Sequence, residues 1–164
     1  MAVVRLTCRS WCDNVSLSSC PFDLMYMEQH IPNNKLLYIS KFKALQELHF
    51  IYCTDITVVG LRSLSVLPAL HTLKILSNNE SITDAELQSL SVLTALKKLH
   101  VKSCCEISDE GLKSLSVMTA LQELGLSSWS NELNCQEVEN VDITDTGLQS
   151  LLVLTALKEL DLGA

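Results

Sequence analysis

The sequence predicts an α/β solenoid, in which a parallel β-sheet lines the concave face and helices cover the convex face. Five short segments are near copies of one another. They read ALQELHF, ALHTLKI, ALKKLHV, ALQELGL and ALKELDL, and they start at Ala44, Ala69, Ala95, Ala120 and Ala156. The starts are 25, 26, 25 and 36 residues apart, which leaves room for one strand and one helix per unit. Because so short a strand cannot bury its apolar face alone, the copies must stack side by side.

Each copy alternates between apolar and polar residues, as a strand with one buried face does. In the first copy, Leu48 and Phe50 are expected to point inward. The residues between and beside them are expected to point outward, onto the concave face. Across the copies these outward positions form three columns: Glu47, Thr72, Lys98, Glu123 and Glu159; His49, Lys74, His100, Gly125 and Asp161; and Ile51, Leu76, Lys102 and Ser127.

A helix is expected between successive strands. The residues suited to cap these helices are Thr57, Thr83, Ser108 and Thr144. Thr83 and Glu86 have the spacing of a capping box, which satisfies two backbone donors at the start of a helix. Apolar residues then recur every three positions, as Leu61/Leu64/Leu67, Leu87/Leu90/Leu93, Leu112/Leu115/Met118 and Leu148/Leu151/Leu154. Gly60, Gly111 and Gly147 fall in the first helical turn, where a missing side chain permits close packing between neighbours.

Three segments carry a family resemblance. CTDITVVGL at 53–61, CCEISDEGL at 104–112 and DITDTGL at 142–148 resemble the cysteine-containing subfamily of leucine-rich repeats. That subfamily is best known from the substrate-recognition horseshoes of F-box proteins in ubiquitin ligases. The resemblance covers about residues 36–162 and implies that Cys53 and Cys104 turn inward and are buried. Two units depart from the pattern: one has Asn78 at the cysteine position and Ala85-Glu86 at the glycine position, and the unit of Trp129 lacks the cysteine. No F-box pattern is recognisable in the residues before the repeats.

The chain divides into two regions. Residues 1–35 are expected to form an N-terminal capping or degenerate repeat region, in which residues 3–8 could add one more strand. Residues 36–164 hold the leucine-rich repeats, with an insertion at about 128–141 and no C-terminal cap. Because an uncapped last repeat leaves its apolar edge in water, we expect either a longer polypeptide with further repeats or a partner at this end, self-association included.

Composition limits the classes of partner and compartment. The net charge of −7 argues against a general binder of nucleic acid or anionic membranes, which would repel the chain at long range. No run of about 18 apolar residues occurs, and no signal peptide is evident at the N-terminus. Seven irregularly spaced cysteines fit a reducing compartment better than a disulfide framework. We therefore expect an intracellular protein, either cytoplasmic or nuclear.

The sequence offers no set of residues suited to catalysis. Phosphate-binding glycine loops, nucleophile elbows and zinc-protease motifs are all missing. His49 and His100 share a column but lie two repeats apart, about 10 Å, too far to bind one metal ion. Cys8, Cys12, Cys20 and His30 have the ligand types of zinc but match no common spacing. We expect no enzymatic activity, no metal and no cofactor.

Two regions are candidates for binding a protein partner. The middle of the concave face is basic through Lys74, Lys98, His100 and Lys102, and the C-terminal end of the face is acidic, beginning with Glu123. The insertion holds Trp129 among acidic residues, which suits an aromatic anchor. The alternatives are solvated strand residues and a tolerated surface loop. The sequence thus predicts a non-catalytic protein-interaction scaffold, or alternatively the substrate-recognition part of a ubiquitin ligase whose recruiting domain is absent from this chain.

Overall fold

Seven parallel strands, taken from the described part of the chain, form one sheet in the order of the sequence. The computed structural model describes residues 3–7, 24–28, 39, 42–51, 56–76, 82–102, 107–127 and 143–163. The strands are β1 (Val3–Thr7), β2 (Leu24–Glu28), β3 (Glu47–Ile51), β4 (Thr72–Leu76), β5 (Lys98–Lys102), β6 (Glu123–Ser127) and β7 (Glu159–Asp161). Their parallel order requires each connection to cross over, which is the geometry that a strand-and-helix repeat produces.

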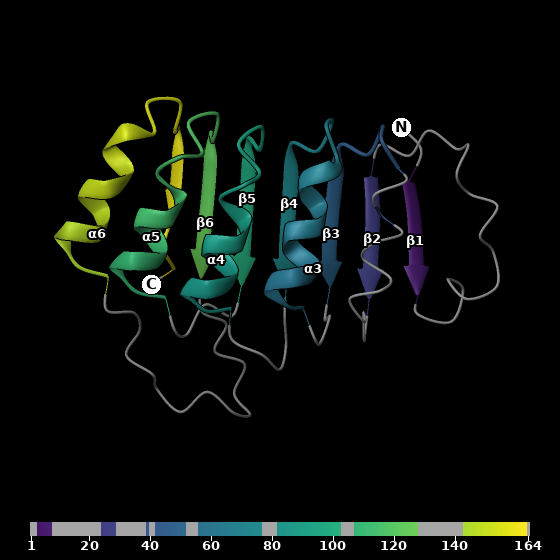
Figure 1. The fold of residues 1–164 in the computed structure, drawn as a ribbon, viewed down its shortest axis with the longest axis horizontal. Helices are drawn as coiled ribbons and strands as arrows, with labels where there is room; N and C mark the ends of the chain where they lie inside the picture. The colour runs from purple at the N-terminus through teal and green to yellow at the C-terminus, as the bar shows by residue number, and fades with distance from the viewer. Residues whose placement is uncertain are drawn as a thin grey trace.

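Short helices cover one face of the sheet (Figure 1). They are α3 (Val58–Arg62), α4 (Asp84–Leu90), α5 (Asp109–Leu115) and α6 (Asp145–Ser150), and the 3-10 segments η2 (Ser63–Val66) and η3 (Leu151–Val153) continue α3 and α6. The expected caps are confirmed: the side chains of Thr57, Thr83, Ser108 and Thr144 all accept a backbone N–H of the first turn. The α/β solenoid predicted by the sequence is therefore the observed architecture.

The register of the sheet confirms the expected columns. Glu47 pairs with Thr72, Thr72 with Lys98, Lys98 with Glu123, and Glu123 with Glu159. One carbonyl per repeat fixes this register. The carbonyl of Gln46 accepts the N–H groups of His71 and Thr72 at 2.9 and 3.1 Å, and the carbonyls of His71, Lys97 and Gln122 each do the same for the next repeat.

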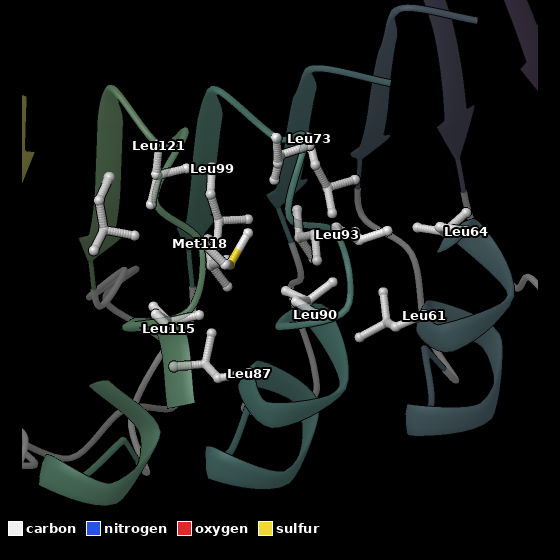
Figure 2. Close-up of a cluster of buried hydrophobic side chains, with 14 of the residues drawn as sticks. Leu61, Leu64, Leu73, Leu87, Leu90, Leu93, Leu99, Leu115, Met118 and Leu121 are labelled. Atoms are coloured by element: carbon white, nitrogen blue, oxygen red, sulfur yellow. The ribbon is translucent and has the colours of Figure 1, made fainter. Parts of the chain in front are cut away.

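The core is a layer of aliphatic side chains between the helices and the sheet (Figure 2). The labelled side chains are Leu61, Leu64, Leu73, Leu87, Leu90, Leu93, Leu99, Leu115, Met118 and Leu121, and all are buried. Truncating one such leucine to alanine typically costs about 2–5 kcal/mol. One expected core residue differs, because Leu148 is 37% exposed whereas its equivalent Leu112 is fully buried. Leu112 has α6 packed against its helix, and α6 has no described helix beyond it.

Aspartate side chains join successive helices. The Asp84 carboxylate at the start of α4 accepts two hydrogen bonds from Ser108, from its N–H at 2.9 Å and from its hydroxyl at 2.6 Å. Asp109 at the start of α5 holds Thr144 in the same way, with both distances at 2.7 Å. We call each of these a carboxylate clamp, because one side chain satisfies the capping residue of the next helix.

The clamps explain two of the three glycines of the first helical turn, Gly111 and Gly147. A Cβ at Gly111 would overlap Asp84 Oδ1, and a Cβ at Gly147 would overlap Asp109 Oδ1. The α3–α4 junction is built differently, since Val58 stands where the aspartate would be. There Glu86 occupies the glycine position and its Oε2 accepts the N–H and hydroxyl of Thr83 at 3.2 and 2.5 Å. The predicted capping box thus takes the place of the clamp at this junction. Glu86, from the same helix as Thr83, supplies the carboxylate that the previous repeat lacks.

Several sequence predictions fall outside the described residues. These are the inward position of Cys53 and Cys104, the ligand types at Cys8, Cys12, Cys20 and His30, and the insertion that holds Trp129. At the N-terminus, β1 occupies most of the segment for which a further strand was suggested, and β2 continues the sheet. Whether residues 1–35 act as a capping or degenerate repeat region stays a prediction.

Candidate functional site

The sheet face opposite the helices is the candidate interaction surface. We call it the open face, and it consists of the outward side chains of β3 to β7. In β3 and β5, outward residues are partly exposed and inward residues are buried, as the alternation predicted. Backbone pairing already holds these strands in place. Binding a partner to the outward side chains therefore costs little further conformational entropy of the backbone.

A three-residue charge cluster lies across β5 and β6. Lys98 Nζ is 2.6 Å from Glu123 Oε1, and His100 Nε2 is 3.7 Å from Glu123 Oε2. The hydrogen bond from Lys98 lowers the pKa of the Glu123 carboxyl below 4.5, and the same bond raises the pKa of Lys98 above 10.5. Both groups lie at the surface, so solvent weakens their attraction. The cluster therefore fixes the positions of charged groups more than it adds stability.

Gly125 leaves space for the imidazole ring of His100. Gly125 follows Glu123 on the outward side of β6 and pairs with His100 in the register. A Cβ at this position would lie 2.7 Å from His100 Nδ1. The missing side chain thus lets the imidazole lie across β6, close to the Glu123 carboxylate. Any larger residue would push the ring away from this position.

A second cluster of ionisable residues lies on β3 and β4. His49 Nε2 is 3.7 Å from Glu47 Oε2, and His49 pairs with Lys74 on the next strand. Burial lowers the pKa of His49 below 6.5, and the positive charge of Lys74 lowers it further, while Glu47 opposes the shift. This part of the open face consequently favours the neutral form of His49.

Thr72 interrupts the first column between Glu47 and Lys98. Its position on β4 was expected to be outward, and yet only 3% of its surface is exposed. Its hydroxyl lies 3.1 Å from His71 Nδ1, and His71 Nε2 lies 3.2 Å from Gln46 Oε1. Thr72 therefore offers little surface to a partner.

The structure brings together three of the six predicted binding residues: Lys98, His100 and Glu123. Lys74 pairs with His100 in the second column, so it lies beside this group, whereas Lys102 is exposed and has the uncharged Leu76 and Ser127 as its pairing neighbours. Trp129 lies outside the described residues. The basic middle that the sequence suggested is thus a mixed-charge surface, because the Glu123 carboxylate reaches into it.

Sequence reasoning missed three contributors to this surface. Glu47 and His49 were placed in the correct columns, but their mutual proximity was not expected. Gly125 was also placed correctly, and its role in seating His100 was not foreseen. A signal was present, since glycine interrupts a column of larger polar residues. That signal indicates a close approach by a neighbouring side chain.

In the ranges that the structure describes, no group of three or more histidine, cysteine or acidic residues is arranged to hold a metal ion. None of the described helices combines the length and the apolar character needed to cross a membrane.

Comparison with known families agrees with the architecture. A Leucine Rich repeat family model matches residues 92–116, the stretch that contains β5 and α5. No curated protein matches the chain. The matched unit recurs along the sheet through identical strand pairing and similar helix caps. The chain therefore folds as an α/β leucine-rich-repeat solenoid.

Proposed function

We propose that this protein is a non-catalytic interaction scaffold that binds a protein partner through its open face. Repeat solenoids of this architecture offer extended surfaces for such binding. The proposal rests on one cluster of the sheet, in which the side chains of Lys98 and His100 both lie close to the carboxylate of Glu123. Charged groups held in place contribute to the orientation and encounter rate of a partner more than to raw affinity.

The charges on either side of the cluster define the partner that would fit. Lys74 and Lys102 add positive charge over β4 and β5. Glu159 and Asp161 add negative charge on β7, and both are exposed. The matching partner surface carries acidic groups over β4 and β5 and basic groups over β7, separated by about two strand spacings, roughly 10 Å. Such a pattern also specifies the direction in which the partner lies.

Trp129 forms the second part of the proposal, and the sequence alone supports it. Its segment follows directly after Ser127, the last residue of β6 and the pairing neighbour of Lys102. An aromatic anchor close to a polar cluster is a common arrangement of energetically dominant interface residues. We therefore assign Trp129 to the same interface as Glu123.

The ubiquitin-ligase role is a narrower version of the same proposal. It rests on the resemblance of the segments at 53–61 and 104–112 to the repeats of F-box proteins. It requires a recruiting segment, such as an F-box or RING, in the uninterrupted reading frame. Sequencing the transcript tests this requirement. If the reading frame lacks such a segment, the ligase role is excluded and the proposal of an interaction scaffold remains.

The experiment for the open face compares two sets of substitutions. The first set is Lys98→Ala, His100→Ala and Lys102→Ala. The matched set is Lys97→Ala, Lys113→Ala and Lys158→Ala, three residues that lie outside strands β3 to β7. Proteins captured from the native source by the wild-type chain should be lost with the first set and retained with the second. Circular dichroism checks that both variants are folded. Equal retention by both sets would place the interface elsewhere.

A further inference from the structure

A row of exposed valines lies along the edge of the sheet at which the strands begin. Four strands are entered through nearly the same stretch of sequence: SVLPALH at 65–71, SVLTALK at 91–97, SVMTALQ at 116–122 and LVLTALK at 152–158. These stretches lie together at the upper edge of Figure 1, where the helical segments lead into the strands. We call them the rim. The rim valines are Val66, Val92, Val117 and Val153, and they are 46, 49, 55 and 54% exposed.

The same kind of turn directs each valine outward. The N–H of Leu67 donates to the carbonyl of Leu64 at 3.0 Å, and the equivalent bonds of the next three repeats are each 2.9 Å long. In every turn the residues at both ends of this bond are buried in the core, and the valine stands between them. Val66, Val92 and Val117 belong to repeats with described strands on both sides, so their exposure does not depend on where the sequence ends.

The rim keeps its apolar residues where other exposed positions vary. The first, fourth and seventh positions of the four stretches differ between repeats, whereas the second is always valine and the fifth is always alanine. These alanines are also exposed or partly exposed. A single exposed apolar side chain is ordinary on a protein surface. A row of them on stacked repeats is a continuous apolar patch, which is typical of an interaction site.

Positive charge accompanies the valine row. Lys97 and Lys158 end two of the stretches and are exposed. Lys43 Nζ donates to the carbonyl of Val66 at 2.9 Å, which places its ammonium group at the start of the row. None of the four stretches contains aspartate or glutamate, although the chain has 19 acidic residues. Stabilisation of helix C-termini by cations does not explain Lys97 and Lys158, because each directly precedes a strand.

These features select one class of ligand. Adjacent valines lie about 5–10 Å apart, because paired strands are about 4.8 Å apart and packed helices about 8–10 Å. A narrow row of this kind suits a linear segment of protein better than a bilayer, since the four stretches lack the tryptophan and phenylalanine typical of interfacial anchors. Two rims facing each other would bring like charges together. Acidic groups on the ligand would complement the lysines.

We propose that the rim binds a linear segment of a protein partner that carries aliphatic and acidic side chains. The aliphatic side chains of the segment pack on the valine row, and its carboxylates meet Lys43, Lys97 and Lys158. This surface is separate from the open face. Rim binding depends on Val92 and Val117, and open-face binding depends on Lys98, His100 and Lys102, so the failure of either proposal leaves the other standing.

The test uses a phage-displayed library of random peptides of about twelve residues, long enough when extended to cross the four repeats. Peptides selected on the wild-type chain are synthesised, and their Kd values are measured by fluorescence anisotropy. The rim variant combines Val92→Ser with Val117→Ser. Val59→Ser is the matched control, because Val59 is an exposed valine near the start of α3, away from the rim. Urea unfolding checks that both variants are folded.

We expect a group of selected peptides with net negative charge and aliphatic residues. They should bind the wild type and Val59→Ser equally and lose at least about tenfold in affinity to the rim variant. Lys97→Glu should weaken them too, and more strongly at low salt. The proposal is overturned if no selected peptide is sensitive to the rim variant, or if the sensitive peptides are not acidic. Rim-dependent binding to vesicles of phosphatidylcholine and phosphatidylserine without peptide binding, or a dimer that the rim variant dissociates, overturns it as well.

Discussion

Asp109 binds Thr144 across 35 residues of sequence, with Oδ1 2.7 Å from the Thr144 amide nitrogen and Oδ2 2.7 Å from its hydroxyl. These hydrogen bonds lower the pKa of Asp109 below 3.8. The contact spans the longest gap between repeats, and it matches the one between Asp84 and Ser108 across an ordinary gap. The two clamps therefore have the same hydrogen bonds although 24 residues separate one pair in sequence and 35 the other. This property allows an insertion without disturbing the stack.

Gly111→Ala should destabilise the protein by about 1–3 kcal/mol, because the new Cβ overlaps Asp84 Oδ1 and displaces the clamp. The same substitution in an Asp84→Ala background should be neutral or stabilising by up to about 1 kcal/mol, since alanine has the better helix propensity. Urea unfolding of the four proteins of this cycle measures the coupling. A penalty that is the same in both backgrounds would mean that the glycine serves another purpose.

The α3–α4 junction should be convertible into a clamp. Val58→Asp alone brings a second carboxylate towards Thr83, whose N–H and hydroxyl Glu86 already binds, so it should destabilise. Glu86→Gly alone should cost about 1 kcal/mol through loss of the capping box. The double variant should recover stability, giving a coupling of at least about 1 kcal/mol in thermal unfolding. If the stability losses of the two single variants simply add in the double variant, the clamp and the capping box are not equivalent.

His49→Gln should make stability less sensitive to mild acid. Burial, with Lys74, lowers the folded-state pKa of His49 below its unfolded value of 6.5, so the folded state binds fewer protons. Above pH 6.5 His49 is neutral in both states, so its contribution to stability is complete. As the pH falls from 6.5 towards the lower folded-state pKa, the unfolded state takes up protons and this contribution is lost.

The His49 prediction is measured as urea midpoints at about pH 7.5 and about pH 5.5, above the range in which carboxylates titrate. His71 and His100 remain in both proteins, so their contributions cancel. The wild-type midpoint should fall more than that of the variant. An equal fall in both would show that His49 titrates normally.

Lys98→Met should raise the pKa of Glu123 towards 4.5, because the hydrogen bond from Lys98 is the largest cause of its lowering. The residual lowering should come from His100. A carbon-detected NMR titration of the Glu123 carboxyl measures the change, and Lys113→Met serves as the control because Lys113 pairs with Glu110 on α5 instead. The unfolding temperature should change little, since the pair is exposed to solvent. An unchanged Glu123 titration would mean that the pair does not form in solution.

The sequence could predict the parts that depend on repetition. Residues such as His49, Lys74 and His100 share a column because equivalent strands pair in equivalent registers. The helix caps followed from residue type and position alone. Both inferences need only local periodicity and the requirement that the copies stack.

The contacts between repeats could not be predicted in the same way. The sequence does not indicate whether a carboxylate serves its own helix, as Glu86 does, or the next one, as Asp84 does. The meeting of Lys98 with Glu123 depends on the directions of side chains across strands. Leu148 kept the expected spacing yet is partly exposed, because burial depends on the neighbouring unit and not on the periodicity of the helix itself.

Photo-crosslinking from the open face tests the central claim most directly. Lys102→p-benzoylphenylalanine places the probe on β5, and Lys113→p-benzoylphenylalanine places it on the helix face of the same repeat. Irradiation in the native source should give a discrete crosslinked protein from position 102 that is absent from position 113. Crosslinking from position 113 alone, or the same products from both positions, would contradict the assignment of the open face as the binding surface.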